Sequence, residues 1–345
     1  MGVREYTKHA TTLGVSLTRR LLNTRESGVA LVVLALMLPV LAGMVALVVD
    51  VGQAYEERRE VQTAVDAAAL AGAAYLPESP NAAVAAAIDY ANRNGVTISA
   101  SDVKVYGTYV ASDISLCHTP ILQDTIEVKA ARNVGFGFAK VLGIGSANVS
   151  GSAKAIVGTA GGGTGVMPWA LFPVNGYHYP DEVTLKYAPQ SNQGGNFGAL
   201  AIDGTGANVY RTTIVNGSQR RLNIGDMVAT EPGNMSGPTR QGLSTRIGSD
   251  NTTFSQAVRV NSDDTMSILM PNCPRLVIIP VITALPKGGR TDVEIKGFAQ
   301  VFITSFGGNG NNSWVKARFV KVVDPDAVWS SLGNDYGLRT IRLAR

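Results

Sequence analysis

Residues that could carry out chemistry are few in this sequence and lie far apart. The chain has three histidines, His9, His118 and His178, and this small, scattered set predicts no metal site. No serine stands in the G-x-S-x-G pattern that marks the nucleophile of many hydrolases. The glycine-rich segment 194–198 lacks the Lys-Ser/Thr pair of a phosphate-binding loop. We therefore expect no catalytic residue, no cofactor and no metal, and we do not expect an enzyme.

The segment 231–242, EPGNMSGPTRQG, is the strongest candidate for a binding loop. Its three glycines and two prolines impose special backbone angles, and rigid polar loops on a β scaffold are common binding sites. The side chains that would make the contacts are Glu231, Asn234, Thr239 and Arg240. A plain connection between two elements is nevertheless the default interpretation of this segment.

The two cysteines, Cys117 and Cys273, are a candidate disulfide. They lie in different halves of the sequence after residue 50, and an oxidising compartment would permit the bond. Two buried thiols are an equal alternative, because spacing alone does not show that the two sulfur atoms meet.

The uncharged segment 28–49 predicts a transmembrane helix. Nearly all of its residues are Val, Leu, Ala or Met, and at about 1.5 Å per residue it spans roughly the 30 Å of hydrocarbon in a bilayer. Pro39 would break a soluble helix, but inside a membrane it only kinks the helix. A cleaved signal peptide is the alternative. The helical sequence that continues after Asp50 favours an anchor, with the lipid bilayer as its partner.

The charges on either side of this segment predict its orientation. The arm 1–27 holds five Lys and Arg residues against two acidic ones, and carboxylates crowd the other side. Because the basic flank stays in the cytoplasm, the chain after residue 49 is expected outside a single-pass cell membrane. The formal net charge of +4 owes much to the arm, and no cluster of Lys and Arg interleaved with aromatic residues follows it, so nucleic-acid binding is not expected.

The helical pattern continues outside the membrane through residues 50–77. Apolar residues recur every three or four positions from Tyr55 to Gly72, and Pro77 stops the helix. Without a break the helix would be about 70 Å long. Small side chains border the apolar stripe, and they permit close approach either of a sheet of the same chain or of a partner helix, a second copy included: Ala64, Ala67, Ala68, Ala71, Gly72 and Ala74.

The fold class expected after the anchor is α+β. Residues 78–157 predict a small α+β domain with a helix at 82–93 and strands at 104–110, 125–131 and 147–157. Residues 158–165, GTAGGGTG, predict a flexible linker. Residues 166–345 predict a mostly antiparallel β sandwich or barrel, with strands at 182–187, 197–203, 209–215, 257–260, 276–282, 291–306 and 313–323.

The N-terminal pattern resembles the Tad (tight adherence) family, the TadE/TadG-like proteins of Flp-pilus assembly. The residues that carry the resemblance are spread over about 50 positions: Gly28, Pro39, Asp50, Gly52, Gln62, Asp66 and Ala68. The later segment FGFAKVLGIGSANVS, residues 136–150, is similar to the short helix and strand that often follow in such proteins. Pilin-like members carry a glutamate five residues after the processing glycine, whereas this chain has Val33 there.

The resemblance implies a bacterial envelope protein with three possible roles. The leading one is a membrane-anchored extracytoplasmic component of a Tad/Flp-type pilus assembly or adhesion secretion system, which acts on pilus-assembly or pilin proteins by protein contacts. The second is a minor pilin or filament subunit, against which Val33 argues. The third is a surface enzyme acting on envelope glycan, and only the polar segment 231–242 favours it.

Overall fold

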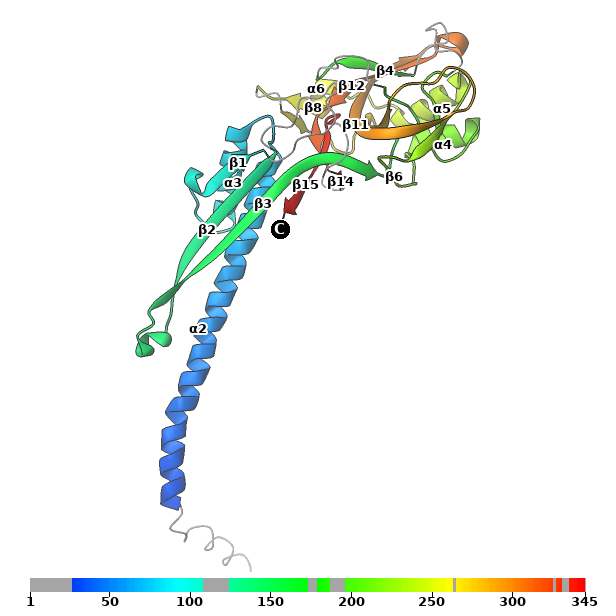
Figure 1. The fold of residues 1–345 in the computed structure, drawn as a ribbon. Helices are drawn as coiled ribbons and strands as arrows, with labels where there is room; N and C mark the ends of the chain where they lie inside the picture. The colour runs from blue at the N-terminus through cyan, green and yellow to red at the C-terminus, as the bar shows by residue number, and fades with distance from the viewer. Residues whose placement is uncertain are drawn as a thin grey trace, which may run out of the picture. The chain divides into compact units, whose positions relative to one another are not determined.

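The computed structural model describes residues 27–107, 124–172, 179–186, 196–262, 265–324, 327–330 and 335–344 (Figure 1). The chain divides into two compact units. The first unit holds the residues up to Glu60 together with Ala131–Ser150, and the second holds Val61–Ala130 and Gly151–Arg345.

Helix α2, Ser27–Ala73, is one helix of 47 residues, as the sequence predicts. Pro39 lies inside it without ending it. The helix ends shortly before Pro77, whose ring and missing N–H cannot continue the pattern. From Gly28 to Val49 its residues are exposed, apart from the half-buried Ala46, whereas Asp50 is buried. From Gly28 onward, Asp50 is therefore the first buried residue of α2, directly after the apolar run, and the next buried residue is Val61.

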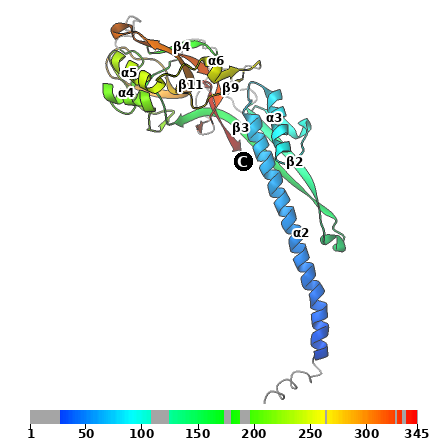
Figure 2. The same ribbon diagram turned by 180° about the vertical axis from the view of Figure 1, so that it is seen from behind.

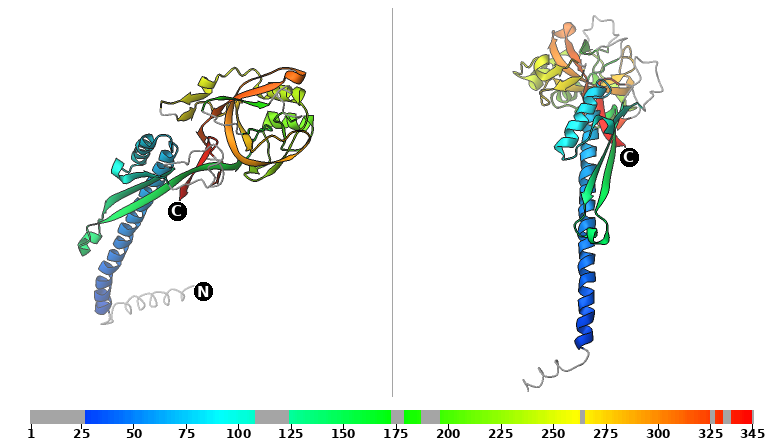
Figure 3. Two further views of the ribbon diagram at one scale, coloured as in Figure 1. Left: turned by 45° about the horizontal axis from the view of Figure 1, so that its top comes forward. Right: turned by 90° about the vertical axis from the view of Figure 1, so that its left-hand side faces the viewer.

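The first unit contains the end of a β-hairpin beside α2. Strands β2 (Thr125–Gly135) and β3 (Ser146–Gly163) are neighbours in one sheet, and the short 3-10 helix η2 (Ala139–Leu142) lies in the loop between them. We call residues 136–145 the hairpin tip. Figures 1 and 2 show the hairpin running along α2, with its tip toward the N-terminal end of that helix, and the right panel of Figure 3 shows the same.

In the second unit, the small residues of α2 let other elements approach closely. A Cβ at Gly72 would lie 2.4 Å from Ile126 Cδ1 of β2 and 2.8 Å from Ala83 O of helix α3 (Pro80–Arg93). A Cβ at Gly151 of β3 would lie 3.2 Å from the Gln62 backbone. The buried face of α2 therefore packs on its own chain, through Val61, Ala64, Val65, Ala68, Ala69 and Ala73. Of the other small residues in the predicted set, Gly72 is buried, Ala67 and Ala71 are half-buried and Ala74 is exposed, so the approach of a partner helix stays a prediction.

The first sheet has seven strands in the order β1-β2-β3-β15-β13, with β14 and β6 also paired to β3. The long strand β3 pairs antiparallel with β15, where Val157 lies opposite Ile341. Only the β13–β15 pairing of this sheet is parallel among the described strands. The 3-10 helix η1 (Ala100–Asp102) leads into β1, and the remaining strands are β1 (Val103–Tyr106), β6 (Leu222–Asn223), β13 (Val322–Val323), β14 (Val328–Ser330) and β15 (Leu338–Ala344).

The second sheet has six strands in the order β4-β12-β11-β7-β5, with β10 also paired to β11. Helices α4 (Ala207–Asn216) and α5 (Ser236–Ile247) share one hydrophobic core with this sheet, through residues such as Tyr210 and Leu243. The strands are β4 (Glu182–Lys186), β5 (Leu200–Ala201), β7 (Met227–Thr230), β10 (Leu276–Ile282), β11 (Asp292–Gly307) and β12 (Trp314–Val320).

Smaller elements complete the second unit. Helix α6 (Phe254–Ala257) precedes the two-stranded sheet β8-β9, and the 3-10 helix η4 (Gly310–Asn312) precedes β12. Strands β8 and β9 are Val258–Val260 and Met266–Ile268. A second core contains residues of both large sheets: Ala160, Leu222 and Leu338 with Leu200, Val228 and Ile295.

The predicted α+β class with mostly antiparallel sheets is confirmed, and no described sheet closes into a barrel. The predicted strand at 209–215 is wrong, because this segment is helix α4, which buries Tyr210, Thr213 and Ile214 on one face. Of the predicted strand 197–203, only Leu200–Ala201 is a strand. The β-branched residues of α4 suit a strand by propensity, and tertiary packing overrides that preference.

The glycine-rich segment 158–165 is not a flexible linker over most of its length, since β3 continues through Gly163. Its glycines make room for neighbouring groups. A Cβ at Gly158 would lie 2.3 Å from Trp329 Nε1, and one at Gly162 would lie 2.4 Å from Leu222 O. Glycine here permits close packing within a sheet. The predicted division of the chain into an α+β domain at 78–157 and a β domain at 166–345 stays a prediction.

Candidate functional site

The most constrained polar contact of the first unit is made by Asp50. Its carboxylate accepts hydrogen bonds from three successive backbone N–H groups of the hairpin tip, at 3.0 Å from Gly137, 2.9 Å from Phe138 and 2.6 Å from Ala139. Asp50 is 2% exposed, although its neighbours on α2 are exposed. The side chain thus fastens the hairpin tip to α2 one residue beyond the apolar run.

The sequence of the hairpin tip explains why its N–H groups are available. Residues Gly137 to Ala139 lie at the start of the short helix η2, and the first N–H groups of a helix have no partner within it. Gly143 ends η2 with φ 84°, a left-handed conformation that glycine adopts without strain. The Phe136 N–H donates to Gly145 O at 3.0 Å and closes the loop. Asp50 therefore caps η2 from another element.

The ionised form of Asp50 is the one that this site favours. Burial of the carboxyl raises its pKa, but the hydrogen bonds from Ala139, Gly137 and Phe138 and the nearby Lys140 outweigh burial, so the pKa of Asp50 lies below its usual value. Hydrogen bonds to the charged form lower the pKa of a carboxyl in this way. The contact is consequently a charged one at neutral pH.

A second contact joins the hairpin to α2 within the first unit. Arg132 Nη1 of β2 lies 2.5 Å from Glu57 Oε2 and 3.3 Å from Glu60 Oε2. The pKa of Arg132 is raised, chiefly by its hydrogen bond to Glu57. Within the hairpin, Asn133 Nδ2 donates to Asn148 Oδ1 at 2.7 Å. The register of hairpin and helix is thus fixed at two places, Asp50 and Arg132.

The other residues of the predicted family motif fall into two groups. Gly28, Pro39 and Gly52 lie on exposed parts of α2, and a Cβ at Gly28 or Gly52 would meet nothing within 4 Å. Gln62, Asp66 and Ala68 belong to the second unit. There Gln62 Nε2 donates to Asp66 Oδ1 at 2.8 Å and to Ser152 O at 3.0 Å, while Ala68 is fully buried.

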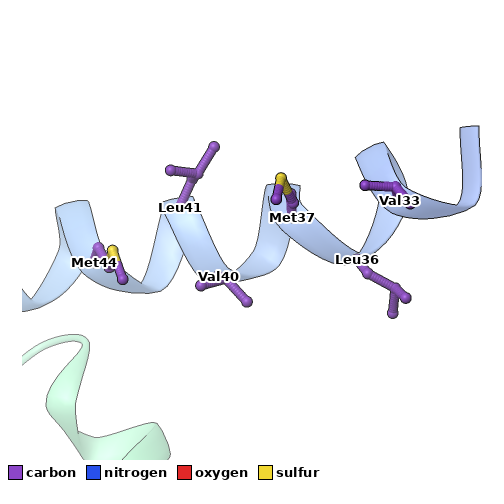
Figure 4. A pocket seen from close by; sticks show the side chains of 6 residues that line it. All are labelled: Val33, Leu36, Met37, Val40, Leu41 and Met44. Carbon is purple, nitrogen blue, oxygen red and sulfur yellow. The ribbon is translucent and has the colours of Figure 1, made fainter. Parts of the chain in front are cut away.

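An apolar hollow lies on the surface of α2 itself. Figure 4 shows the six side chains that line it, all from this one helix: Val33, Leu36, Met37, Val40, Leu41 and Met44. Because a single helix cannot enclose a cavity, the hollow is an open, wholly apolar face. Such a face needs an apolar surrounding.

The predicted binding loop is only partly a loop. Helix α5 begins at Ser236, so Thr239 and Arg240 are helical. Pro238 fits the first turn, where its missing N–H would have had no partner. Three of the four predicted side chains contact their own chain here: Glu231 pairs with Arg290 at 3.1 Å, Thr239 donates to Met235 O at 2.7 Å, and Arg240 donates to Asn309 Oδ1 at 2.7 Å.

Asn234 belongs to a polar cluster that the sequence analysis missed. Lys186 at the end of β4 is buried, and its Nζ donates to Asn234 Oδ1 at 3.0 Å and to Ser313 Oγ at 3.2 Å. Asn234 also donates to Gly310 O. Burial lowers the pKa of Lys186 to about 8. The sequence carries no signal for this cluster, because strand alternation puts Lys186 on the face of Glu182 and Thr184, opposite the buried Val183 and Leu185.

The candidate disulfide stays a prediction, since Cys117 lies outside the described residues. Cys273 is buried, with its Sγ 3.8 Å from Asp250 Oδ2. His9, His118 and His178 also lie outside them. Among the residues that are described, no group of three or more His, Cys, Asp and Glu side chains gathers as metal ligands would.

Among the described helices, one is long and apolar enough to cross a membrane, Gly28–Ala73. A buried core helix or a signal sequence can meet the same test, but the most apolar window of this helix is not buried at all. The findings support a single-pass membrane protein.

Comparison with known proteins gives a family match for the N-terminal segment. No curated protein and no solved structure matches the chain significantly. A family model described as "Putative Flp pilus-assembly TadE/G-like" matches residues 28–74, the segment that holds the apolar run, Asp50 and the buried alanines. The N-terminal segment of this chain is therefore TadE/G-like, and it marks a pilus-related membrane protein.

Proposed function

We propose that this protein is a membrane-anchored, extracytoplasmic component of a Tad/Flp-type pilus assembly or adhesion secretion system. Its residues 28–49 cross the membrane, the basic arm 1–27 stays in the cytoplasm, and the rest of the chain lies outside. It acts by contacts with pilus-assembly or pilin proteins and not by catalysis. The observation that carries the proposal is the TadE/G-like segment, whose exposed apolar run ends at the buried Asp50.

The charge distribution supports this orientation. The five basic residues of the arm precede the apolar run, and the first carboxylates after it are Asp50, Glu56 and Glu57. Asp50 is buried, but by the hairpin tip of its own unit and through charged hydrogen bonds, which suits a position at the edge of the hydrocarbon. Glu56 is exposed, which suits water.

The proposed location is tested by measuring the membrane topology of the protein in its native host. Protease added to intact spheroplasts should remove a C-terminal tag from the protein, while an N-terminal tag should be cut only after lysis. The protein should stay in the membrane pellet after alkaline carbonate extraction. A C-terminal tag that is protected until lysis would contradict the orientation, and a soluble protein whose N-terminus begins after Val49 would show a cleaved signal instead.

Partner recovery tests the role. Cross-linking in native membranes, followed by purification through the C-terminal tag, should recover Tad-type pilus proteins. The minor-pilin alternative predicts that the protein itself appears in the sheared filament fraction. The exposed apolar face of α2 would suit a fibre core as well as lipid, so this fraction is the deciding measurement. Recovery of neither pilus proteins nor filaments would contradict both roles.

The glycan-enzyme alternative gains little from the second unit. Its polar segment 231–242 is engaged with its own chain, as described above. A hollow beside Gly163, lined also by Ile278, Phe298 and Asp324, has a volume of about 80 Å³. Ligand pockets commonly have volumes of roughly 300 to 1,000 Å³. Protein contact stays the proposed mode of action on the evidence of the TadE/G-like segment.

A further inference from the structure

The hairpin tip carries apolar side chains that its own chain leaves uncovered. Val141 is 89% exposed, Phe138 is 55% exposed and Ile144 is 50% exposed. All three lie within seven residues, on and beside η2, and the neighbouring Lys140 is also exposed. Clusters of exposed apolar side chains on a short loop need an explanation, because water solvates them poorly.

The position of this tip along α2 is fixed. Three of its N–H groups contact Asp50, which is the first residue after the apolar run 28–49. Just before Asp50, the exposed side chains of α2 are Leu47, Val48 and Val49. The apolar cluster of the tip therefore lies at the level where the apolar surface of α2 ends. All of these residues belong to the first unit.

We propose that the hairpin tip docks on the bilayer surface, with Phe138, Val141 and Ile144 inserted into the outer interface beside the membrane helix. The inference rests on the proposed membrane span. The exposed apolar side chains of the tip are held at Asp50, directly after the exposed Leu47, Val48 and Val49 of the span, so one bilayer covers both. Lys140 is placed to meet lipid phosphates, as basic residues do at the edge of interfacial apolar segments.

The chemistry of the tip favours lipid over a protein groove. The segment FGFAKVLGIG has one charged side chain, a lysine, and no acidic group. Most of its backbone N–H groups donate to Asp50 or to carbonyls within the loop, such as Ile144 N–H to Ala139 O at 3.1 Å and Gly143 N–H to Lys140 O at 3.0 Å. A loop whose backbone is already bonded enters the interface at lower cost. Asp50 thus prepares the tip for insertion.

Depth-dependent fluorescence quenching tests the inference on the full-length protein. The protein is reconstituted in vesicles of phosphatidylcholine and phosphatidylglycerol at about three to one, a composition that gives an anionic surface. A small environment-sensitive fluorescent amino acid replaces Val141 by codon suppression, which leaves both cysteines untouched. Matched samples carry it at Ser150, an exposed position at the other end of the same hairpin segment, and at Val40 inside the apolar run.

At position 141, spin-labelled lipid should quench the fluorescence and aqueous iodide should quench it about fivefold less than at position 150, since an inserted side chain leaves water. At position 40, lipid quenching should be strong. Lipid quenching at position 40 without lipid quenching at position 141 would overturn the inference about the hairpin tip, but it would agree with the proposed membrane span. Absence of lipid quenching at both positions would overturn the span and, with it, the inference.

The remaining possibility is that a partner protein, and not lipid, covers the hairpin tip. In native membranes, position 141 would then be protected from iodide, while the purified protein in lipid vesicles would show the same iodide quenching at 141 as at 150. That result would overturn lipid docking. In the double variant Val141→Asp and Ile144→Asp, a label at Phe138 should lose its lipid quenching while the label at Val40 keeps it, because carboxylates oppose insertion.

Discussion

The carboxylate of Asp50 and the backbone N–H of Ala139 form a 2.6 Å hydrogen bond, although 89 positions separate them in the sequence. With the two bonds from Gly137 and Phe138, this contact makes one residue of α2 the cap of a helix that lies in a hairpin. An aspartate at this place thus does more than mark the end of an apolar run, because it sets where the hairpin tip lies along α2.

Replacing Asp50 should therefore release the hairpin tip. Asp50→Ala removes the acceptor for three N–H groups, and amide hydrogen exchange in residues 136–145 should become several-fold faster in the reconstituted protein. Glu56→Ala is the matched control, since Glu56 is an exposed acidic residue of the same helix. Exchange that is equally slow in both variants would show that the tip is held by other contacts.

The same contact should depend on pH in one direction. The pKa of Asp50 lies below its usual value in the folded protein, because the three N–H groups favour the carboxylate. Its stabilising effect is therefore complete above the ordinary aspartate pKa of about 4 and is lost as the pH falls through the lower folded value. The iodide accessibility of a label at Val141 should stay constant from neutral pH down to about pH 4 in wild type. Asp50→Asn should show raised accessibility already at neutral pH.

Two glycine-to-alanine substitutions on α2 should change stability in opposite directions, one through close packing and the other through helix propensity. In Gly72→Ala the new Cβ would lie 2.8 Å from the Ala83 carbonyl oxygen, so we expect a loss of about 1 to 3 kcal/mol in the free energy of unfolding. Gly52→Ala, on the same helix, meets nothing within 4 Å and should stabilise α2 by up to about 1 kcal/mol. Thermal unfolding in detergent compares the two variants. A stabilised Gly72→Ala would show that α3 and β2 do not pack as described.

The sequence predicted the long helix because its signals are local. The uncharged run, the periodic stripe to Gly72 and the stop at Pro77 each depend on neighbours in the chain. Asp50 was identified by family resemblance, but its partners were not, since nothing local connects it to residues 89 positions away.

Two sequence predictions, the flexible linker and the strand at 209–215, were wrong because the same residue types occur in two kinds of structure. Glycines at 158–163 predict flexibility, but Gly158 and Gly162 are small so that Trp329 and the Leu222 backbone can approach β3. The β-branched residues at 209–215 predict a strand, but the face of Tyr210 and Ile214 fits a helix against the second sheet. Only the tertiary neighbours decide between the two kinds.

Lys186 should make stability depend on alkaline pH. Burial lowers its pKa to about 8 in the folded protein, against about 10.4 in the unfolded chain. Between these values the unfolded chain holds a proton that the folded protein has released, so the contribution of Lys186 to the free energy of unfolding rises with pH across this window. Lys186→Met should abolish that rise. Denaturant unfolding at several pH values from 7.5 to about 10 measures it.

The control for this experiment is Lys287→Met, which removes an equal charge from an exposed position. The informative quantity is the difference in pH slope between the two variants, because tyrosines titrate near the upper end of the window. Identical slopes in Lys186→Met, Lys287→Met and wild type would show that the Lys186 ammonium stays charged throughout the window.

Replacing Arg339 should lower the free energy of unfolding more than replacing any other charged residue described in the second unit. It lies on β15 with a side chain that is 8% exposed, and its guanidinium contacts Glu78 at 2.6 Å and Asp335 at 2.5 Å. Burial lowers the pKa of Arg339, but the two carboxylates raise it further, so the group stays charged. Arg339→Met would remove the buried guanidinium that contacts both carboxylates and would leave Glu78 with Lys321 at 3.5 Å, and we expect a loss of about 3 to 5 kcal/mol in the free energy of unfolding.

Two comparisons make the Arg339 result interpretable. Arg259→Met removes an exposed arginine of β8 and should change the free energy of unfolding by less than about 0.5 kcal/mol. The triple variant Arg339→Met, Glu78→Gln and Asp335→Asn also removes the two negative charges, and it should recover part of the lost stability, since burying these carboxylates without the guanidinium costs free energy. Denaturant unfolding followed by tryptophan fluorescence compares all three. If the triple variant were no more stable than Arg339→Met, the loss would come from side-chain packing around β15 and not from the buried ion pairs.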